Sequence, residues 1–377
     1  MIYLDNNATT PVADEVIAAM TPYYRELYGN AHAIHSLGRR SHDAVEASRE
    51  EVALLLGCGR DEVIFTSCGT EGNALVLRGL IDRRPLRRKV VTTSVEHPSV
   101  LLLLRALERE GLIELAIIPV STAGEIDLDR MQEAIDDHTL LVTVMLAQNE
   151  TGVLHPVPQI AALAHGRGAL VHVDAVQAAG KIPIDQRALG ADFLTISGHK
   201  FHAPKGIGAL TLRQGLSLQP LWYGGGQELG LRSGTEPVPS IAGLAVAAGL
   251  ARKALGSYDR VRSLRDRLES AILTRIPGTS VNGGSQPRLA NTANISFHGV
   301  PADEMVRALD AAGICTSAGA ACHSGNVEPS GTMKAMGLPL DVAMGAVRFS
   351  LSRYTTESEI DQVIEKVIEM RAAGRTS

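Results

Sequence analysis

The sequence of 377 residues has few cysteines, few aromatic residues and no excess of basic residues. Its four cysteines are too few for a disulfide framework, and none forms a CxxC pair of the kind that binds structural zinc. One Trp, seven Tyr and five Phe offer little for a base-stacking surface, and a net charge of −5 argues against a basic nucleic-acid-binding face. We therefore expect a reduced, cytoplasmic protein with no nucleic-acid partner.

Long apolar runs are also absent from the sequence. No run reaches the roughly 18 to 20 residues that a membrane helix needs, and residues 1–7 lack the basic and apolar regions of a signal peptide. We therefore expect no association with a membrane. The length predicts two or three domains, at about 150 residues per domain.

Short apolar runs alternate with longer helical patterns over the first two thirds of the chain. The runs that predict strands are 62–66, 89–93, 140–146, 170–174, 193–197 and 208–212. The patterns that predict helices between them include 43–56, 100–109 and 159–167. Continuous Val, Ile and Leu suits strands buried on both faces, so this alternation predicts an α/β domain with a parallel sheet at about residues 13–255.

The pattern changes after residue 255. Residues 258–276 read as one long helix, and short strands and helices follow it, as in an α+β unit. We place a second, smaller domain at residues 256–377 and expect residues 1–12 to join it.

Asp174 and Lys200 are the first pair that suggests chemistry. Asp174 ends one apolar run, and Lys200 follows another in the turn Gly198-His199-Lys200. Ligands of open parallel sheets bind at the carboxyl ends of the strands, where both residues would lie. A lysine that forms a Schiff base and a carboxylate that pairs with a pyridinium nitrogen suit pyridoxal phosphate (PLP). A structural ion pair at the sheet edge is the alternative.

Several neighbours add to this hypothesis. Gly69 and Thr70 open a helix, where backbone N–H groups attract a phosphate, although Thr70 has the alternative role of a helix cap. Ser197 and His199 lie just before Lys200 in the sequence and offer further donors to the same phosphate. The remaining candidates that follow strands are His97, Asn149 and Gln177, of which Gln177 is expected to begin the next helix.

Two residues in the second domain are candidates for substrate chemistry. Cys322 lies in a small, polar segment, which suits an accessible nucleophilic thiol, although an incidental surface thiol fits equally well. Arg348 alternates with apolar residues on a predicted strand and suits a substrate carboxylate, with an internal ion pair as the alternative. Pairs such as His199 and His202 complete no known metal motif, so we expect no metal.

Taken together, the motifs resemble those of the PLP-dependent cysteine desulfurases of the NifS/IscS type, within the class V aminotransferase group. The motifs that carry the resemblance, in order, are 3–11 (YLDNNATTP), 96–97 (EH), 149–152 (NETG), 172–177 (HVDAVQ), 197–200 (SGHK), 232–235 (RSGT) and 347–353 (VRFSLSR). The resemblance implies PLP fold type I, with a mostly parallel seven-stranded sheet in the large domain and the nucleophile loop in the small α+β domain.

The resemblance also implies a role for each candidate. Its cofactor contacts are Lys200 as the Schiff-base lysine, Asp174 at the pyridinium nitrogen, Gln177 at the phenolic oxygen, His97 as the stacking acid/base, and Gly69, Thr70, Ser197 and His199 at the phosphate. Thr235 resembles the residue that reaches the phosphate of the neighbouring subunit, which implies a homodimer. Asn149 and Arg348 resemble the groups that hold the substrate carboxylate, with Asn30 as a helper.

The implied reaction converts L-cysteine to L-alanine and leaves the sulfur on Cys322 as a persulfide, for delivery to an acceptor such as an iron–sulfur cluster scaffold protein. Two features depart from the family pattern. Residues 319–323 read Gly-Ala-Ala-Cys-His in place of a Ser-rich stretch, which is similar to selenocysteine lyases, and His32 replaces a small polar residue. The alternatives are therefore a selenocysteine lyase, another class V reaction, or a non-catalytic scaffold with the same fold.

Overall fold

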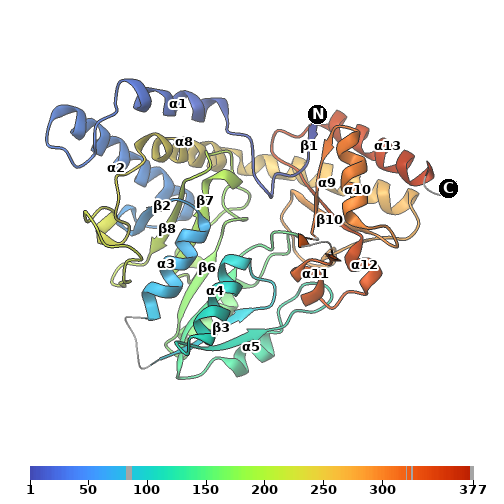
Figure 1. Ribbon diagram of the computed structural model, residues 1–377, viewed down its shortest axis with the longest axis horizontal. Helices are drawn as coiled ribbons and strands as arrows, with labels where there is room; N and C mark the ends of the chain where they lie inside the picture. The colour runs from blue at the N-terminus through green and yellow to red at the C-terminus, as the bar shows by residue number, and fades with distance from the viewer. Residues whose placement is uncertain (82–86, 320, 324–325, 374–377) are drawn as a thin grey trace.

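The computed structural model describes residues 1–81, 87–319, 321–323 and 326–373, with the backbone alone at 321–323, 326–327 and 372–373. A seven-stranded sheet with its helices forms the larger part of the molecule, and a four-stranded sheet lies beside it (Figure 1). This arrangement confirms the predicted α/β fold class.

The seven-stranded sheet contains all six predicted strands. Its strands, in spatial order, are β2 (Val63–Thr66), β8 (Gly208–Leu212), β7 (Phe193–Ser197), β6 (Leu170–Asp174), β5 (Thr139–Met145), β3 (Lys89–Thr93) and β4 (Glu114–Ile118). The pairs from β7 to β4 are parallel, whereas β8 is antiparallel to both of its neighbours. Every side chain of β5, β6 and β7 is buried, which explains their mainly apolar sequences.

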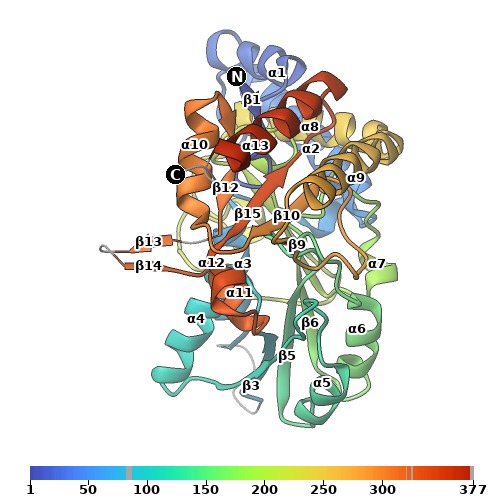
Figure 2. The same ribbon diagram turned by 90° about the vertical axis from the view of Figure 1, so that its right-hand side faces the viewer.

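Helices cover both faces of this sheet, with α4 and α6 on opposite sides in Figure 2. The helices of this part are α1 (Asp14–Arg25), α2 (Ser36–Leu56), α3 (Gly69–Ile81), α4 (Pro98–Arg109), α5 (Leu128–Ala134), α6 (Val157–His165), α7 (Gln186–Leu189) and α8 (Val238–Ala254). Helix α2 begins seven residues before the predicted start at residue 43, because the His35 ring accepts a hydrogen bond from the Gly38 N–H and caps a polar first turn.

The four-stranded sheet lies in the C-terminal third of the chain. Its strands, in spatial order, are β12 (Ser317–Ala318), β15 (Ala346–Ser350), β10 (Thr292–Phe297) and β9 (Thr279–Val281). The other elements here are α9 (Tyr258–Arg275), α10 (Ala302–Ala311), α11 (Gly331–Ala335), α12 (Leu340–Met344), α13 (Glu357–Ala373), β11 (Ile314–Cys315), β13 (Ala321–His323) and β14 (Asn326–Glu328). Strand β1 (Ile2–Tyr3) pairs in parallel with β11, so the N-terminus lies beside this sheet.

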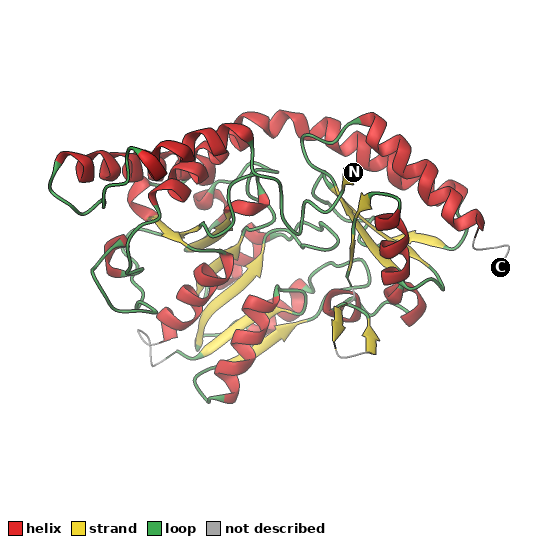
Figure 3. Cartoon of the chain, turned by 45° about the horizontal axis from the view of Figure 1, so that its top comes forward, coloured by secondary structure: helices red, strands yellow, loops and turns green. Residues whose placement is uncertain are grey.

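A nearly continuous helical run, residues 238–275, extends along the top of the molecule in Figure 3. By length and apolar composition alone this run could cross a membrane, which the sequence patterns did not predict. Core helices of soluble proteins satisfy the same test. Here α8 packs on α1 and α2, and Ile241, Leu244 and Ala248 are fully buried.

Candidate functional site

The carboxyl ends of β6 and β7 open into a cavity of about 350 Å³. Asp174 is the last residue of β6, and Lys200 ends the short turn that follows β7. The two strands are parallel neighbours, so both side chains reach the same edge of the sheet, where the sequence predicted them. This is the edge at which open α/β sheets bind their ligands.

Ten of the thirteen predicted site residues line this cavity. They are Gly69, Thr70, His97, Asn149, Asp174, Gln177, Ser197, His199, Lys200 and Arg348. The cavity also contains residues to which the sequence assigned no role, namely Asn7, Ala8, Cys68, Asn73, Ser99, Met145, Ala147 and Val176.

Lys200 lies against the N-terminal segment of the chain. Its ammonium group donates to the carbonyl oxygens of Asn7 at 2.7 Å and Ala8 at 2.8 Å. Burial, together with the positive charge of Arg348, lowers the pKa of Lys200 to about 8. The free amine, which is the nucleophilic form, is therefore accessible near neutral pH.

Asp174 is held by donors on two sides. The Asn73 amide donates to its Oδ2 at 2.9 Å, and the Val176 N–H donates to its Oδ1 at 3.0 Å. The Asn73 amide also donates to the Ser99 hydroxyl, which lies 2.8 Å from Nδ1 of His97. Burial lowers the pKa of His97 and the charge of Lys200 adds to this, so the ring is neutral at pH 7. Hydrogen bonds through Asn73 and Ser99 thus connect the Asp174 carboxylate to the His97 imidazole.

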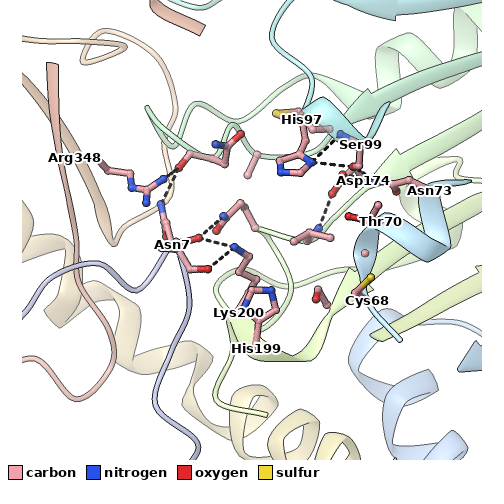
Figure 4. A pocket seen from close by; sticks show the side chains of 18 residues that line it. Asn7, Cys68, Thr70, Asn73, His97, Ser99, Asp174, His199, Lys200 and Arg348 are labelled. Atoms are coloured by element: carbon pink, nitrogen blue, oxygen red, sulfur yellow. Dashed lines mark hydrogen bonds between the residues drawn. The ribbon is translucent and has the colours of Figure 1, made fainter. Parts of the chain in front are cut away.

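One end of the cavity is suited to a phosphate. The N-terminus of α3 opens there at Gly69 and Thr70, and His199 lies next to Lys200 in the same cavity (Figure 4). The Ser197 hydroxyl oxygen also lines this cavity, is buried, and has no partner among the described residues. An unpartnered buried hydroxyl is costly, so a ligand acceptor at this end would supply the missing hydrogen bond.

The opposite end holds Arg348, on β15 (Figure 4). Its guanidinium donates to Asp5 Oδ1 at 2.8 Å and to the Asn149 carbonyl at 2.9 Å, so an internal ion pair is present in this structure. Nε of Arg348 is buried without a partner among the described residues. The cavity is therefore bounded by anion-attracting groups at both ends, and the Asp174 carboxylate lies near Thr70 and Asn73 (Figure 4).

The prediction that Gln177 begins a helix is wrong. Gln177 lies in a turn rather than at the start of a helix, since the next helix, α7, begins at Gln186. From this turn its amide donates to the Asn7 carbonyl at 2.9 Å, while its Oε1 accepts from the buried Lys181 at 2.8 Å. Lys181 also donates to Asn7 Oδ1, so this turn fixes the N-terminal segment across the cavity.

Three predicted site residues lie elsewhere. Asn30 and Thr235 do not line the cavity and sit on two surface loops, which the His32 ring and the Glu236 carboxylate join at 3.1 Å. The Cys322 side chain lies outside the described side chains. Its backbone belongs to β13, which pairs with β14 in a hairpin that projects from the molecule in Figure 2. In the described part of the chain no three His, Cys, Asp or Glu residues gather as metal ligands would.

Comparisons with known proteins show the family to which the chain belongs. The family described as Aminotransferase class-V matches residues 2–363. The chain is 48% identical to cysteine desulfurase 2 of Trichormus variabilis over 365 residues, which cover 97% of this chain and 92% of the relative. A solved structure called NIFS-like protein superposes with a TM-score of 0.92 at 36% identity, over 98% of this chain and 99% of that one. A structure described as SspA in complex with cysteine superposes with a TM-score of 0.82 at 32% identity, over 94% and 100% of the two chains.

Proposed function

This chain belongs to the class V aminotransferase family, and we propose that it is a PLP-dependent cysteine desulfurase that converts L-cysteine to L-alanine. One observation carries the proposal. Lys200 and Asp174 converge at the ends of two parallel strands, in one cavity with a phosphate-suited end and an arginine at the other end. The structural relative described in complex with cysteine supports the choice of substrate.

The residues present fit the cofactor. Ser197, with its unpartnered hydroxyl, would bind the phosphate together with Thr70, His199 and the backbone N–H groups at the start of α3. Lys200 would hold the aldehyde carbon, and Asp174 would hold the proton of the ring nitrogen. When bound, PLP supplies an electron sink for the negative charge that develops on the substrate's α-carbon.

The other cavity residues would handle substrate and protons. Arg348 would hold the substrate carboxylate, exchanging part of its ion pair with Asp5, while Asn149 lies beside it. The His97 ring would lie over the cofactor, with Gln177 at its phenolic oxygen. Lys200, whose pKa of about 8 allows both protonation states near neutral pH, would move the α-proton.

Cys322 is the proposed sulfur acceptor within the chain. Its thiolate would attack the sulfur of the substrate, and the electron pair of the breaking carbon–sulfur bond would stay with the substrate carbon. Protonation of that carbon gives alanine, and the sulfur remains on Cys322 as a persulfide. A protein such as an iron–sulfur cluster scaffold would then take the sulfur; this acceptor and a cytoplasmic location rest on the family resemblance.

We also propose a homodimer with shared sites, in which Thr235 reaches the partner's phosphate and Asn30 assists at the substrate. The loops that carry them expose large apolar side chains, including Tyr28 (70% exposed), Ile34 (90%) and Tyr223 (83%). Such a patch is typical of an interface between proteins.

The proposed division into two domains, at residues 13–255 and at 1–12 with 256–377, has its own support. Leu4 and apolar side chains between Tyr258 and Val367 form a buried cluster of their own. Limited proteolysis tests the division: cleavage near residue 256 should leave two fragments that each resist further digestion.

The decisive experiment measures alanine and sulfide released from L-cysteine by the PLP-loaded protein in the presence of a reductant. Equal amounts of the two products support the proposal. Parallel assays with L-selenocysteine decide the main alternative, because a selenocysteine lyase would turn over the selenium substrate while leaving cysteine almost untouched.

A further inference from the structure

Glu150 lies beside Gly319 and Thr332, the two residues between which the segment that carries Cys322 runs. At the C-terminal end of this segment, at the start of α11, the Thr332 hydroxyl donates a hydrogen bond to Glu150 Oε1 at 2.6 Å. The same hydroxyl accepts from the Gln148 amide at 2.8 Å. Thr332 is thus tied twice to the segment 148–150, which follows β5.

At the N-terminal end of the segment, the backbone of Gly319 lies unusually close to the same carboxylate. A Cβ atom at residue 319 would lie 2.4 Å from Glu150 Oε2 and 3.2 Å from the side chain of Ser330. A side chain at residue 319 would displace the Glu150 carboxylate, which therefore lies in the space between the two ends of the segment. The residues just before Gly319 form β12, whose Ser317 pairs with Arg348 on β15.

The backbone around Glu150 belongs to the cofactor cavity. Its neighbour Asn149 lines that cavity, and the Asn149 carbonyl accepts from Arg348 at 2.9 Å and from the Asn7 amide at 3.3 Å. The Glu150 carbonyl accepts from the Asn294 amide at 3.2 Å. A movement of residues 148–150 would therefore move the substrate end of the cavity and both ends of the Cys322 segment together.

The Glu150 carboxylate has no place in the chemistry derived above. It does not line the cofactor cavity, and its Oε2 is buried with no partner among the described residues. Burial raises the pKa of Glu150, and the nearby Thr332 and Ser330 hydroxyls and the positive charge of Arg348 oppose that rise. A buried carboxyl group in this position costs free energy, which suggests that its shape and hydrogen bond serve a purpose.

We propose that Glu150 is a positioning residue for sulfur transfer, which fixes Gly319 and Thr332 relative to the cavity and so sets where Cys322 meets the substrate. The inference rests on the proposed function, since it assigns a role only if Cys322 accepts sulfur. Glu150 does not touch substrate or cofactor and acts through the ends of the segment. A shift of about 1 Å in a reacting group is enough to cost about 100-fold in rate.

The test compares Glu150→Ala with Glu150→Gln in the PLP-loaded enzyme. Glu150→Ala should lower the kcat for alanine release about 10- to 100-fold, with KM for cysteine and the visible absorbance of the cofactor unchanged. Glu150→Gln keeps an oxygen for the Thr332 hydroxyl and should stay within about threefold of wild type. The rate at which iodoacetamide labels Cys322, followed by peptide mass spectrometry, should show that the thiol in the Ala variant is still reactive.

A second pair of variants approaches the same contact from the other side. Thr332→Val removes the hydroxyl and should lower kcat in the same way, whereas Thr332→Ser restores it. Glu150→Ala combined with Thr332→Val should be no slower than the slower single variant, because each single variant already breaks the contact between Glu150 and Thr332. These variants also answer the objection that Glu150→Ala misfolds, since Thr332→Val leaves the carboxylate in place.

Distinct outcomes separate this inference from the proposed function. If wild-type enzyme releases no alanine, or if Cys322→Ala is fully active, the proposed function fails. If wild type is active and Cys322→Ala is inactive, but Glu150→Ala keeps its kcat, the positioning role alone is wrong. A Glu150→Ala variant that raises KM or loses PLP would place the residue in the binding site and would also overturn it.

Discussion

The sheet-edge cavity and the two surface loops at residues 27–35 and 222–237 are built in opposite ways. In the cavity, Asp174 and Lys200 are each fixed by two hydrogen bonds to neighbouring elements. On the loops, Tyr28 and Tyr223 are largely exposed, and the described contact between the loops is the ring of His32 against Glu236. The comparison teaches that the groups that would do chemistry on the cofactor have a fixed geometry, whereas the loops expose apolar side chains that the proposed dimer would cover.

The largest expected effect comes from the centre of the cavity. Lys200→Ala should lower alanine release at least about 1,000-fold, because it removes both the attachment point of PLP and the base. Borohydride reduction followed by peptide mass spectrometry should find PLP on residue 200 of wild type and nowhere in the variant. Lys205→Ala, at an exposed position five residues away, is the matched control and should behave as wild type. Covalent PLP on Lys181 in the variant would move the attachment to that buried amine.

Much of this cavity could be predicted from the sequence, for a physical reason. Strands β6 and β7 are buried on both faces, so their apolar runs mark their ends, and a polar residue at such an end must lie at the sheet edge. The edge strand β4 was missed, because its partly exposed Glu-Leu-Ala-Ile-Ile run gives a weaker pattern. Its presence was implied only by the seven strands that the family resemblance suggested.

The contribution of the N-terminal segment could not be predicted in this way. Asn7 is held by Gln177, Lys181 and Thr292, and its carbonyl accepts from Lys200, 193 residues away in the chain. The periodicity of a sequence reflects local secondary structure, so it cannot indicate a contact between residues this far apart in the chain. Asn73 and Ser99 were missed for a related reason, because their hydrogen bond forms only when helices α3 and α4 pack against each other.

The second prediction extends the comparison to the segment that carries Cys322. Cys322→Ala should lower cysteine-dependent sulfide release at least about 100-fold, while the cofactor absorbance stays as in wild type because this thiol holds no part of PLP. Cys58→Ala is the control, since burial raises the pKa of that thiol to about 12 and leaves it unreactive. Persulfide found by mass spectrometry on Cys68, which lines the cavity, would assign the nucleophile to the rigid region instead.

The third prediction concerns a buried acid next to His97. Burial raises the pKa of Glu96 from 4.5 to about 8, although Thr93 and the Met145 N–H donate to it. Between these values the folded chain holds a proton that the unfolded chain loses. The free energy of unfolding therefore falls as pH rises, by up to about 1.4 kcal/mol per pH unit from this group.

Glu96→Gln removes that titration while keeping an acceptor oxygen for both donors. Urea unfolding at pH 6.5, 7.25 and 8 should show the variant gaining stability relative to wild type as pH rises. The buried His155 and His172, whose pKa values burial lowers to about 4, are present in both proteins, so their titration cancels from the difference between the variant and wild type. A difference between the proteins that does not change with pH would mean that Glu96 is already ionised in the folded chain.

The smallest expected effect tests the surface loops. Thr235 is exposed in this chain, and we propose that it reaches the phosphate of the partner's cofactor. Losing one ordinary hydrogen bond costs about 0.5 to 1.5 kcal/mol, so Thr235→Ala should weaken PLP retention about 2- to 10-fold. A cofactor that contacts both subunits stabilises the dimer by mass action, so removing PLP should also shift sedimentation toward monomer. Thr274→Ala, exposed on helix α9, is the control and should change neither property. A PLP-loaded protein that sediments as a monomer at all concentrations, or equal PLP retention in both variants, would return Thr235 to the role of an ordinary loop residue and leave the exposed apolar side chains of these loops without a partner.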